Sequence, residues 1–142
     1  MTIALPVALT TVAACALINF WLAMRIVKIR MSQGIVHGDG GDSRMAARMR
    51  AHANFAEYTP IVLILIALIE LAMGTSLWLW LAGGTYVVAR ILHPIGMDGW
   101  LPERQVGTIG TFTAMLLLAV AGLAVPWMTS AESRTVVIEQ PR

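Results

Sequence analysis

Three side chains that could bind a small charged molecule stand at the start of a long apolar run. Arg50, Asn54 and Glu57 follow one another at intervals of four and three residues. At 100° per residue, this spacing places a cation, an amide and a carboxylate on one narrow face of a helix. Because an ionised side chain inside a membrane span costs roughly 2.5–3.5 kcal/mol, we expect this face to turn toward other helices and find partners there.

The composition indicates an integral membrane protein. The chain has 142 residues, of which 58% are hydrophobic and 13% are charged, and its mean hydropathy is +0.74. A soluble domain is usually about a quarter charged, so this apolar excess is too large for one small core. The net charge is only +2, and no basic stripe alternates with aromatic residues, so we expect no nucleic-acid partner. The single cysteine, Cys15, permits neither an intramolecular disulfide nor a multi-cysteine metal site.

Four apolar segments reach or approach the length of about 20 residues that a spanning helix needs. We therefore predict an all-α membrane protein with a single domain, a four-transmembrane-helix bundle. Its spans are expected at about 3–27, 46–73, 76–94 and 103–128, followed by a loosely ordered tail at 129–142. The third run is borderline, because residues 77–92 number only 16, although its two tryptophans suit a membrane interface.

The positions of the basic residues predict the orientation in the membrane. Eight of the ten Lys and Arg residues lie in the segments 25–50 and 90–104, whereas Arg134 and Arg142 follow the fourth span. The positive-inside rule then places both segments in the cytoplasm and both termini outside. The Gly-Asp-Gly-Gly at 38–41 lacks the lysine and the preceding strand of a P-loop. We interpret it as a loop, with Asp42 or Ser43 as the N-cap of the second helix.

Polar side chains from several helices are expected to meet at the cytoplasmic end of the bundle. Arg30 ends the first helix, Arg90 and His93 lie near the end of the third, and Arg104 opens the fourth. The spacing leaves two interpretations open. One is structural: salt bridges between helices, such as Glu57 with Arg90, and arginines that reach the membrane surface. The other is a pocket with excess positive charge that suits a small ligand bearing carboxylates.

The three histidines do not predict a metal site. They stand at positions 37, 52 and 93, far apart in the chain, and His52 is two residues from both Arg50 and Asn54. On a helix that offset turns His52 away from the face that those two residues share. We therefore leave it out of the candidate pocket.

The motif Arg-x-x-x-Asn-x-x-Glu at 50–57 resembles the MAPEG family, the membrane-associated proteins in eicosanoid and glutathione metabolism. Gly-Asp-Gly-Gly at 38–41 and Arg-Ile-Leu-His at 90–93, followed by Arg104, add to the likeness. It covers about residues 20–125 and is strongest for bacterial members, which implies a bacterial inner membrane as the location. The resemblance implies a homotrimer of four-helix protomers, with glutathione bound as co-substrate between adjacent protomers at the cytoplasmic side. The glutathione-binding positions that it implies are Arg30, Arg50, Asn54, Glu57, Arg90 and His93.

The resemblance also implies a catalytic pair, Arg104 and Thr108. Arg104 matches an arginine at the start of the fourth helix that lies near the sulfur of glutathione. It would stabilise the thiolate by lowering a thiol pKa from about 8.5, and Thr108, one turn on, could donate a hydrogen bond. This first hypothesis is a glutathione transferase or peroxidase, whose thiolate attacks a lipophilic small molecule that arrives from the membrane lipid.

Two further hypotheses remain open. The sequence departs from the family pattern at four positions. Ala53 stands where some eukaryotic members have an arginine, and Met97 where they often have a tyrosine. After Arg104, Gln105 and Thr108 stand where a serine or tyrosine is expected. These departures favour a non-catalytic binding or scaffold protein of the same fold. The third hypothesis is a small multidrug transporter, which would need an acidic residue in the first span, and residues 3–24 contain none.

Overall fold

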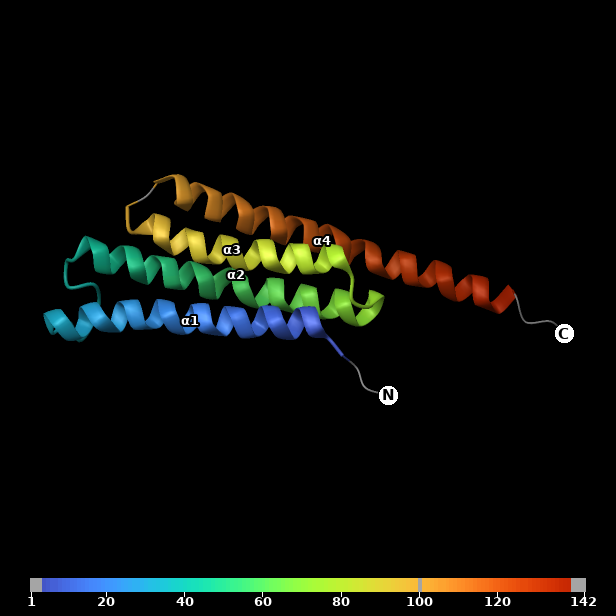
Figure 1. The fold of residues 1–142 in the computed structure, drawn as a ribbon, viewed down its shortest axis with the longest axis horizontal. Helices are drawn as coiled ribbons and strands as arrows, with labels where there is room; N and C mark the ends of the chain where they lie inside the picture. The colour runs from blue at the N-terminus through green and yellow to red at the C-terminus, as the bar shows by residue number, and fades with distance from the viewer. Residues whose placement is uncertain (1–3, 100, 139–142) are drawn as a thin grey trace.

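The computed structural model describes residues 4–99 and 101–138, and within these it describes the side chains except at 101, 103 and 129–138. The four helices are α1 (Pro6–Gln33), α2 (Ser43–Met73), α3 (Leu77–Met97) and α4 (Leu101–Ile138). They run alongside one another in an elongated bundle, and α1 begins toward the same end at which α4 finishes (Figure 1). The prediction of an all-α, four-helix architecture is confirmed.

Three of the helices are long and apolar enough to cross a membrane. The qualifying segments are Pro6–Gln33, Ser43–Met73 and Arg104–Met128. Helix α3, the borderline run in the sequence, is not apolar enough to be counted among them. It packs against α1, α2 and α4 over its length (Figure 1). Its Arg90 and His93 are therefore covered by protein rather than exposed.

Local signals in the sequence explain where the helices begin and end. Asp42 is the N-cap of α2, and its Oδ1 accepts hydrogen bonds from the N–H groups of Arg44 and Met45 at 2.8 and 3.0 Å. Gly34 ends α1 in the left-handed conformation with φ of 66°, which glycine adopts without a Cβ penalty. Helix α2 continues through Pro60.

The core joins apolar side chains from all four helices, and α3 and α4 approach most closely. Two glycines of α4 and one of α3 make that approach possible. A Cβ on Gly107 would lie 2.6 Å from the His93 nitrogen, and one on Gly96 would lie 2.0 Å from the Arg104 nitrogen. A Cβ on Gly110 would lie 2.9 Å from that of Ala89. Small residues thus let the two backbones meet where His93 and Arg104 stand.

The sequence predicted a tail from residue 129, and the structure describes residues 129–138 as a continuation of the fourth helix. Helix α4 continues to Ile138 and extends past the ends of the other helices (Figure 1). No glycine follows Gly122, so the sequence contains no residue that would end the helix by adopting the left-handed conformation. Residues 139–142 lie outside the described residues.

Candidate functional site

Arg90 is buried in the interior of the bundle, where it is 1% exposed. Its Nη1 donates to Asn54 Oδ1 at 3.1 Å and to Thr111 Oγ1 at 3.4 Å. Its Cζ lies 5.2 Å from the centroid of the Phe55 ring. One guanidinium group therefore links helices α2, α3 and α4. The side-chain oxygen of Asn54 accepts this hydrogen bond, so the amide nitrogen of Asn54 is the atom that can donate to a ligand.

A second cluster lies where α3 meets the first turns of α4. His93 is 7% exposed, and its Nδ1 lies 3.2 Å from Thr108 Oγ1. The Thr108 hydroxyl also donates to the Arg104 carbonyl at 2.8 Å. Arg104 and Thr108 border a surface hollow of about 400 Å³ together with Gln105 and Ile109. Three of the predicted site residues, His93, Arg104 and Thr108, are thus brought together.

The remaining predicted residues lie elsewhere in the molecule. Arg30 is partly buried in a groove of about 250 Å³ between α1 and α2, where it donates to the Val36 carbonyl at 2.9 Å. Arg50 and Glu57 are exposed on α2. The predicted example of a salt bridge between Glu57 and Arg90 is wrong within this chain, because Arg90 bonds to Asn54 and Glu57 is exposed.

The placement of His52 agrees with its exclusion from the face of Arg50 and Asn54. It lines the α1–α2 groove with Arg30, and its Nε2 lies 2.8 Å from Asn19 Oδ1 of α1. Asn19 is the strongly polar residue of the first apolar run, and this contact gives it a partner on the neighbouring helix. Among the described residues, no group of three or more His, Cys, Asp or Glu side chains could hold a metal ion.

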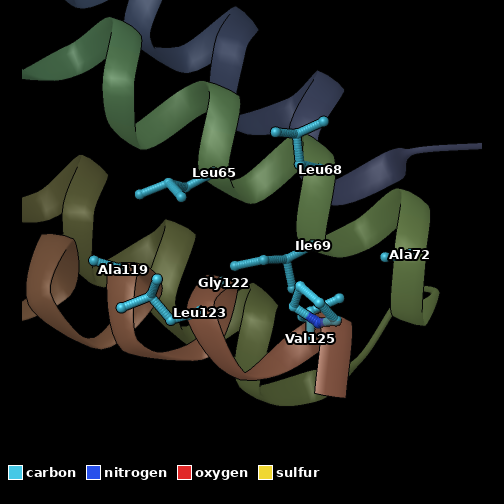
Figure 2. Close-up of a pocket in the computed structure, with 9 residues that line it drawn as sticks. Leu65, Leu68, Ile69, Ala72, Ala119, Gly122, Leu123 and Val125 are labelled. Atoms are coloured by element: carbon cyan, nitrogen blue, oxygen red, sulfur yellow. The ribbon is translucent and has the colours of Figure 1, made fainter. Parts of the chain in front are cut away.

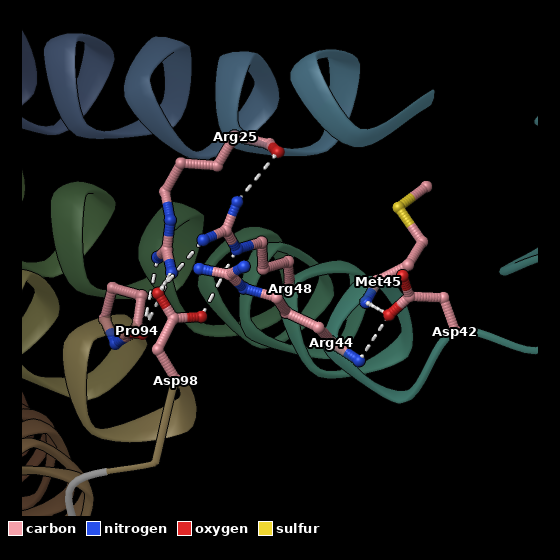
Figure 3. A network of polar contacts seen from close by, with 7 residues as sticks. All are labelled: Arg25, Asp42, Arg44, Met45, Arg48, Pro94 and Asp98. Atoms are coloured by element: carbon pink, nitrogen blue, oxygen red, sulfur yellow. Dashed lines mark hydrogen bonds and ion pairs between the residues drawn. The ribbon is translucent and has the colours of Figure 1, made fainter. Parts of the chain in front are cut away.

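The sequence did not reveal an ion-pair cluster around Asp98, which stands just after α3. Arg25 of α1 and Arg48 of α2 both form ion pairs with its carboxylate, and Figure 3 shows the three side chains converging. Arg25 also donates to the Pro94 carbonyl at 3.3 Å, and Arg48 donates to the Arg25 carbonyl at 3.3 Å. The cluster fixes the α3–α4 turn against α1 and α2, and so holds His93 and Arg104 at this end.

An apolar pocket lies between α2 and α4, in the half of the bundle away from Asp98. Its volume is about 590 Å³, and Figure 2 shows the apolar side chains of both helices around it. Its lining includes Leu65, Leu68 and Leu123 and carries no ionisable group. It can accommodate an apolar chain, but none of its lining side chains could donate or accept a proton in a reaction.

Comparison with known proteins identifies the family. The model of the MAPEG family matches residues 8–124. The chain is also 30% identical over 114 residues to the inner membrane protein YecN of Escherichia coli K12, covering 79% of this chain and 87% of YecN. The match to YecN of Escherichia coli O6:H1 (strain CFT073) has the same identity and coverage. The resemblance in the sequence is therefore confirmed: this chain is an integral membrane protein and belongs to the MAPEG family.

Proposed function

We propose that this protein binds glutathione at the cytoplasmic end of the bundle and uses its thiolate to attack lipophilic electrophiles. The observation that carries the proposal is the joined cluster of His93, Thr108 and Arg104 beside an open hollow. An exposed guanidinium group next to that hollow can stabilise a thiolate by its charge and by hydrogen bonds. Ile109 gives the same hollow an apolar wall, which suits an electrophile from the lipid phase.

The scattered positions of the other residues favour a site shared between protomers. Arg30 lies in the α1–α2 groove, whereas Arg50 and Glu57 are exposed on α2 and line neither that groove nor the hollow beside Arg104. One protomer thus offers separate parts of a site on different surfaces. In a homotrimer, one protomer's α1–α2 surface would face the α4 surface of its neighbour and complete the site.

Each side chain matches a group of the glutathione molecule. Arg30 and Arg50 present forked donors for the two carboxylates, and Glu57 presents a carboxylate for the ammonium group. The amide nitrogen of Asn54 is oriented by Arg90 and can donate to a peptide carbonyl. Arg90 is too deeply buried to reach the ligand, so we assign it as a positioning residue.

The reaction forms a bond between sulfur and carbon. Glutathione loses its thiol proton to water, and Arg104 stabilises the resulting thiolate. The sulfur attacks the electrophilic carbon, and the leaving group departs with its bonding electron pair. Thr108 serves mainly to position His93, because its own proton is already donated to the Arg104 carbonyl.

The test compares binding with thiolate formation in the purified protein. Glutathione should bind to the wild type and produce the ultraviolet absorbance of a thiolate. Arg104→Ala should lose that absorbance and the turnover of a chloronitrobenzene while it keeps most of the binding. Glu57→Gln should instead weaken the binding itself. An absence of glutathione binding in the wild type would refute the proposal.

A non-catalytic binding protein is the second candidate function. Two observations favour it. The Thr108 hydroxyl already donates its proton to the Arg104 carbonyl, and Met97 offers no hydroxyl group near the end of α3. This alternative predicts glutathione binding to the wild type without thiolate absorbance and without conjugation. The same titration therefore separates the two functions.

A further inference from the structure

Three arginines converge on one carboxylate at the end of the bundle where α1 passes into α2. Arg25 and Arg48 form ion pairs with Asp98, whose side chain is 31% exposed. Arg44 stands one turn before Arg48 on α2, and Figure 3 shows its side chain extending toward the same point. Arg44 and Arg48 both act on the charge of Arg25. Arg44 is exposed, and within the described part of the chain its side chain forms neither a hydrogen bond nor an ion pair.

A fourth cation, Lys28, lies at the same level of the bundle. Helices α1 and α2 run in opposite directions, and Arg48 donates to the Arg25 carbonyl at 3.3 Å (Figure 1). Arg44, one turn before Arg48, is therefore level with Lys28, one turn after Arg25. Lys28 is exposed. We call Arg25, Lys28, Arg44 and Arg48 the basic group.

The carboxylates beside the basic group do not balance its charge. Asp98 is shared by two arginines. Among the described residues, the other carboxylate in contact is Asp42, which already accepts hydrogen bonds from Gln33 and from two N–H groups at the start of α2. Four cations thus stand with two carboxylates, and an added anion would reduce the repulsion between the cations.

The neighbouring face of α1 has the polarity profile of a lipid. Residues 3–24 carry no charge, so Arg25 is the first charged residue beyond the apolar run. Its Cζ lies 4.9 Å from the centroid of the Trp21 ring, and tryptophan is typical of the level of lipid headgroups. Leu17, one turn deeper on the same face, is 72% exposed. Apolar, aromatic and basic side chains therefore follow one another along α1 toward the membrane surface.

We propose that the basic group binds the headgroup of an anionic phospholipid. Arg44 and Lys28 contact the phosphate, Arg25 and Arg48 add their charge, and the acyl chains lie along Trp21 and Leu17. Forked donors such as the guanidinium group of Arg44 match the oxygens of a phosphate. The site is separate from the proposed glutathione site, which uses none of these four cations.

The experiment counts lipids bound to the full-length protein in an uncharged maltoside detergent. Native mass spectrometry gives the fraction of protein that carries a lipid as dioleoyl phosphatidylglycerol or dioleoyl phosphatidylcholine is added. The two lipids have the same acyl chains, and only the first has a net negative charge. The apparent Kd for phosphatidylglycerol should be lower by about tenfold or more, since each nearby basic residue contributes about a fivefold effect.

Matched variants locate the bound lipid. Arg44→Gln and Lys28→Gln should each raise the apparent Kd for phosphatidylglycerol about fivefold and leave that for phosphatidylcholine unchanged. Both side chains are exposed, so these variants should fold. Arg50→Gln is the control, because it removes an exposed arginine six residues further on, from a different face of α2. It should bind phosphatidylglycerol as the wild type does.

Four outcomes would overturn the proposal. Equal affinity of the wild type for the two lipids would show that the basic group does not recognise headgroup charge. An equal loss in Arg50→Gln and Arg44→Gln would mean that the lipid responds to net charge alone. Displacement of the lipid by inorganic phosphate at constant ionic strength would assign the basic group to a free anion. Displacement by glutathione would make the basic group part of the glutathione site.

Discussion

The buried carboxylate of Glu70 fixes the start of α1 against the end of α2. Its two oxygens accept the N–H groups of Val7 and Ala8 at 3.0 and 2.8 Å, and Thr75 donates to it at 2.8 Å. Pro6 has no N–H, so these are the first two donors of the helix. A carboxylate at a helix N-terminus is also favoured by the helix dipole.

Replacing Glu70 by Gln should destabilise the protein by about 1–3 kcal/mol, because an amide leaves one buried N–H facing another donor. Thermal unfolding in detergent would measure the loss. Glu57→Gln is the matched control, since Glu57 is exposed, and it should change the unfolding free energy by less than about 0.5 kcal/mol. Equal effects of the two substitutions would contradict the assigned role of Glu70.

Asp42 gives the protein a component of stability that depends on pH. A hydrogen bond from the Gln33 side chain, followed by those from Met45 and Arg44, lowers the pKa of its carboxyl below the ordinary 3.8. A carboxyl with a lower pKa in the folded state stabilises the fold at pH above its ordinary value. That contribution is lost as the pH falls through the folded-state pKa.

Asp42→Asn should remove this pH dependence and keep the cap, because asparagine is also a good N-cap residue. Unfolding would be followed between about pH 2 and 6, the range in which carboxyl groups titrate. The difference between wild type and variant should shrink toward acid. A difference that stays constant with pH would mean that the charge of Asp42 contributes nothing.

At the scale of the helix, the contact between α3 and α4 determines the geometry of the candidate site. Gly107 meets the backbone of His93, so a larger residue there cannot be accommodated by a rotamer change. Gly107→Ala should destabilise the protein by about 1–3 kcal/mol and weaken glutathione binding by separating His93 from Thr108. Gly84→Ala is the control: it has open space around it and should be neutral or slightly stabilising. Equal melting temperatures in both variants would argue against close α3–α4 packing.

The sequence predicted the helices better than it predicted how they are rotated. Apolar length and capping residues determine α1 and α2, so their positions followed directly from the sequence. The spacing of Arg50, Asn54 and Glu57 defines one face of α2 but says nothing about which way that face turns. In the structure only Asn54 points inward to Arg90, and the other two are exposed. The Asp98 cluster was missed because its partners are 50 residues or more away in the chain.

At the scale of the whole molecule, the residues proposed to bind glutathione lie at separate places on the chain. This arrangement predicts whether two different mutant chains can regain glutathione binding when they are mixed. Arg30 lines the α1–α2 groove, and Glu57 is exposed on α2 without lining that groove. If they act in one glutathione site across an interface, each site takes one of them from each chain. Each single variant alone, Arg30→Ala or Glu57→Gln, should then bind glutathione poorly.

Mixed oligomers distinguish a shared site from one contained in a single protomer. When Arg30→Ala and Glu57→Gln chains assemble at random in equal amounts, about one quarter of the interfaces combine the two intact residues and regain binding. A site within one protomer would regain none, because every chain carries one substitution. The matched control mixes wild type with a chain carrying both substitutions. There a shared site leaves about one quarter of the sites intact and a site within one protomer leaves about one half. Measuring glutathione stoichiometry in the two mixtures therefore tests the assembly and the site together, since only an interface site gives the same fraction in both.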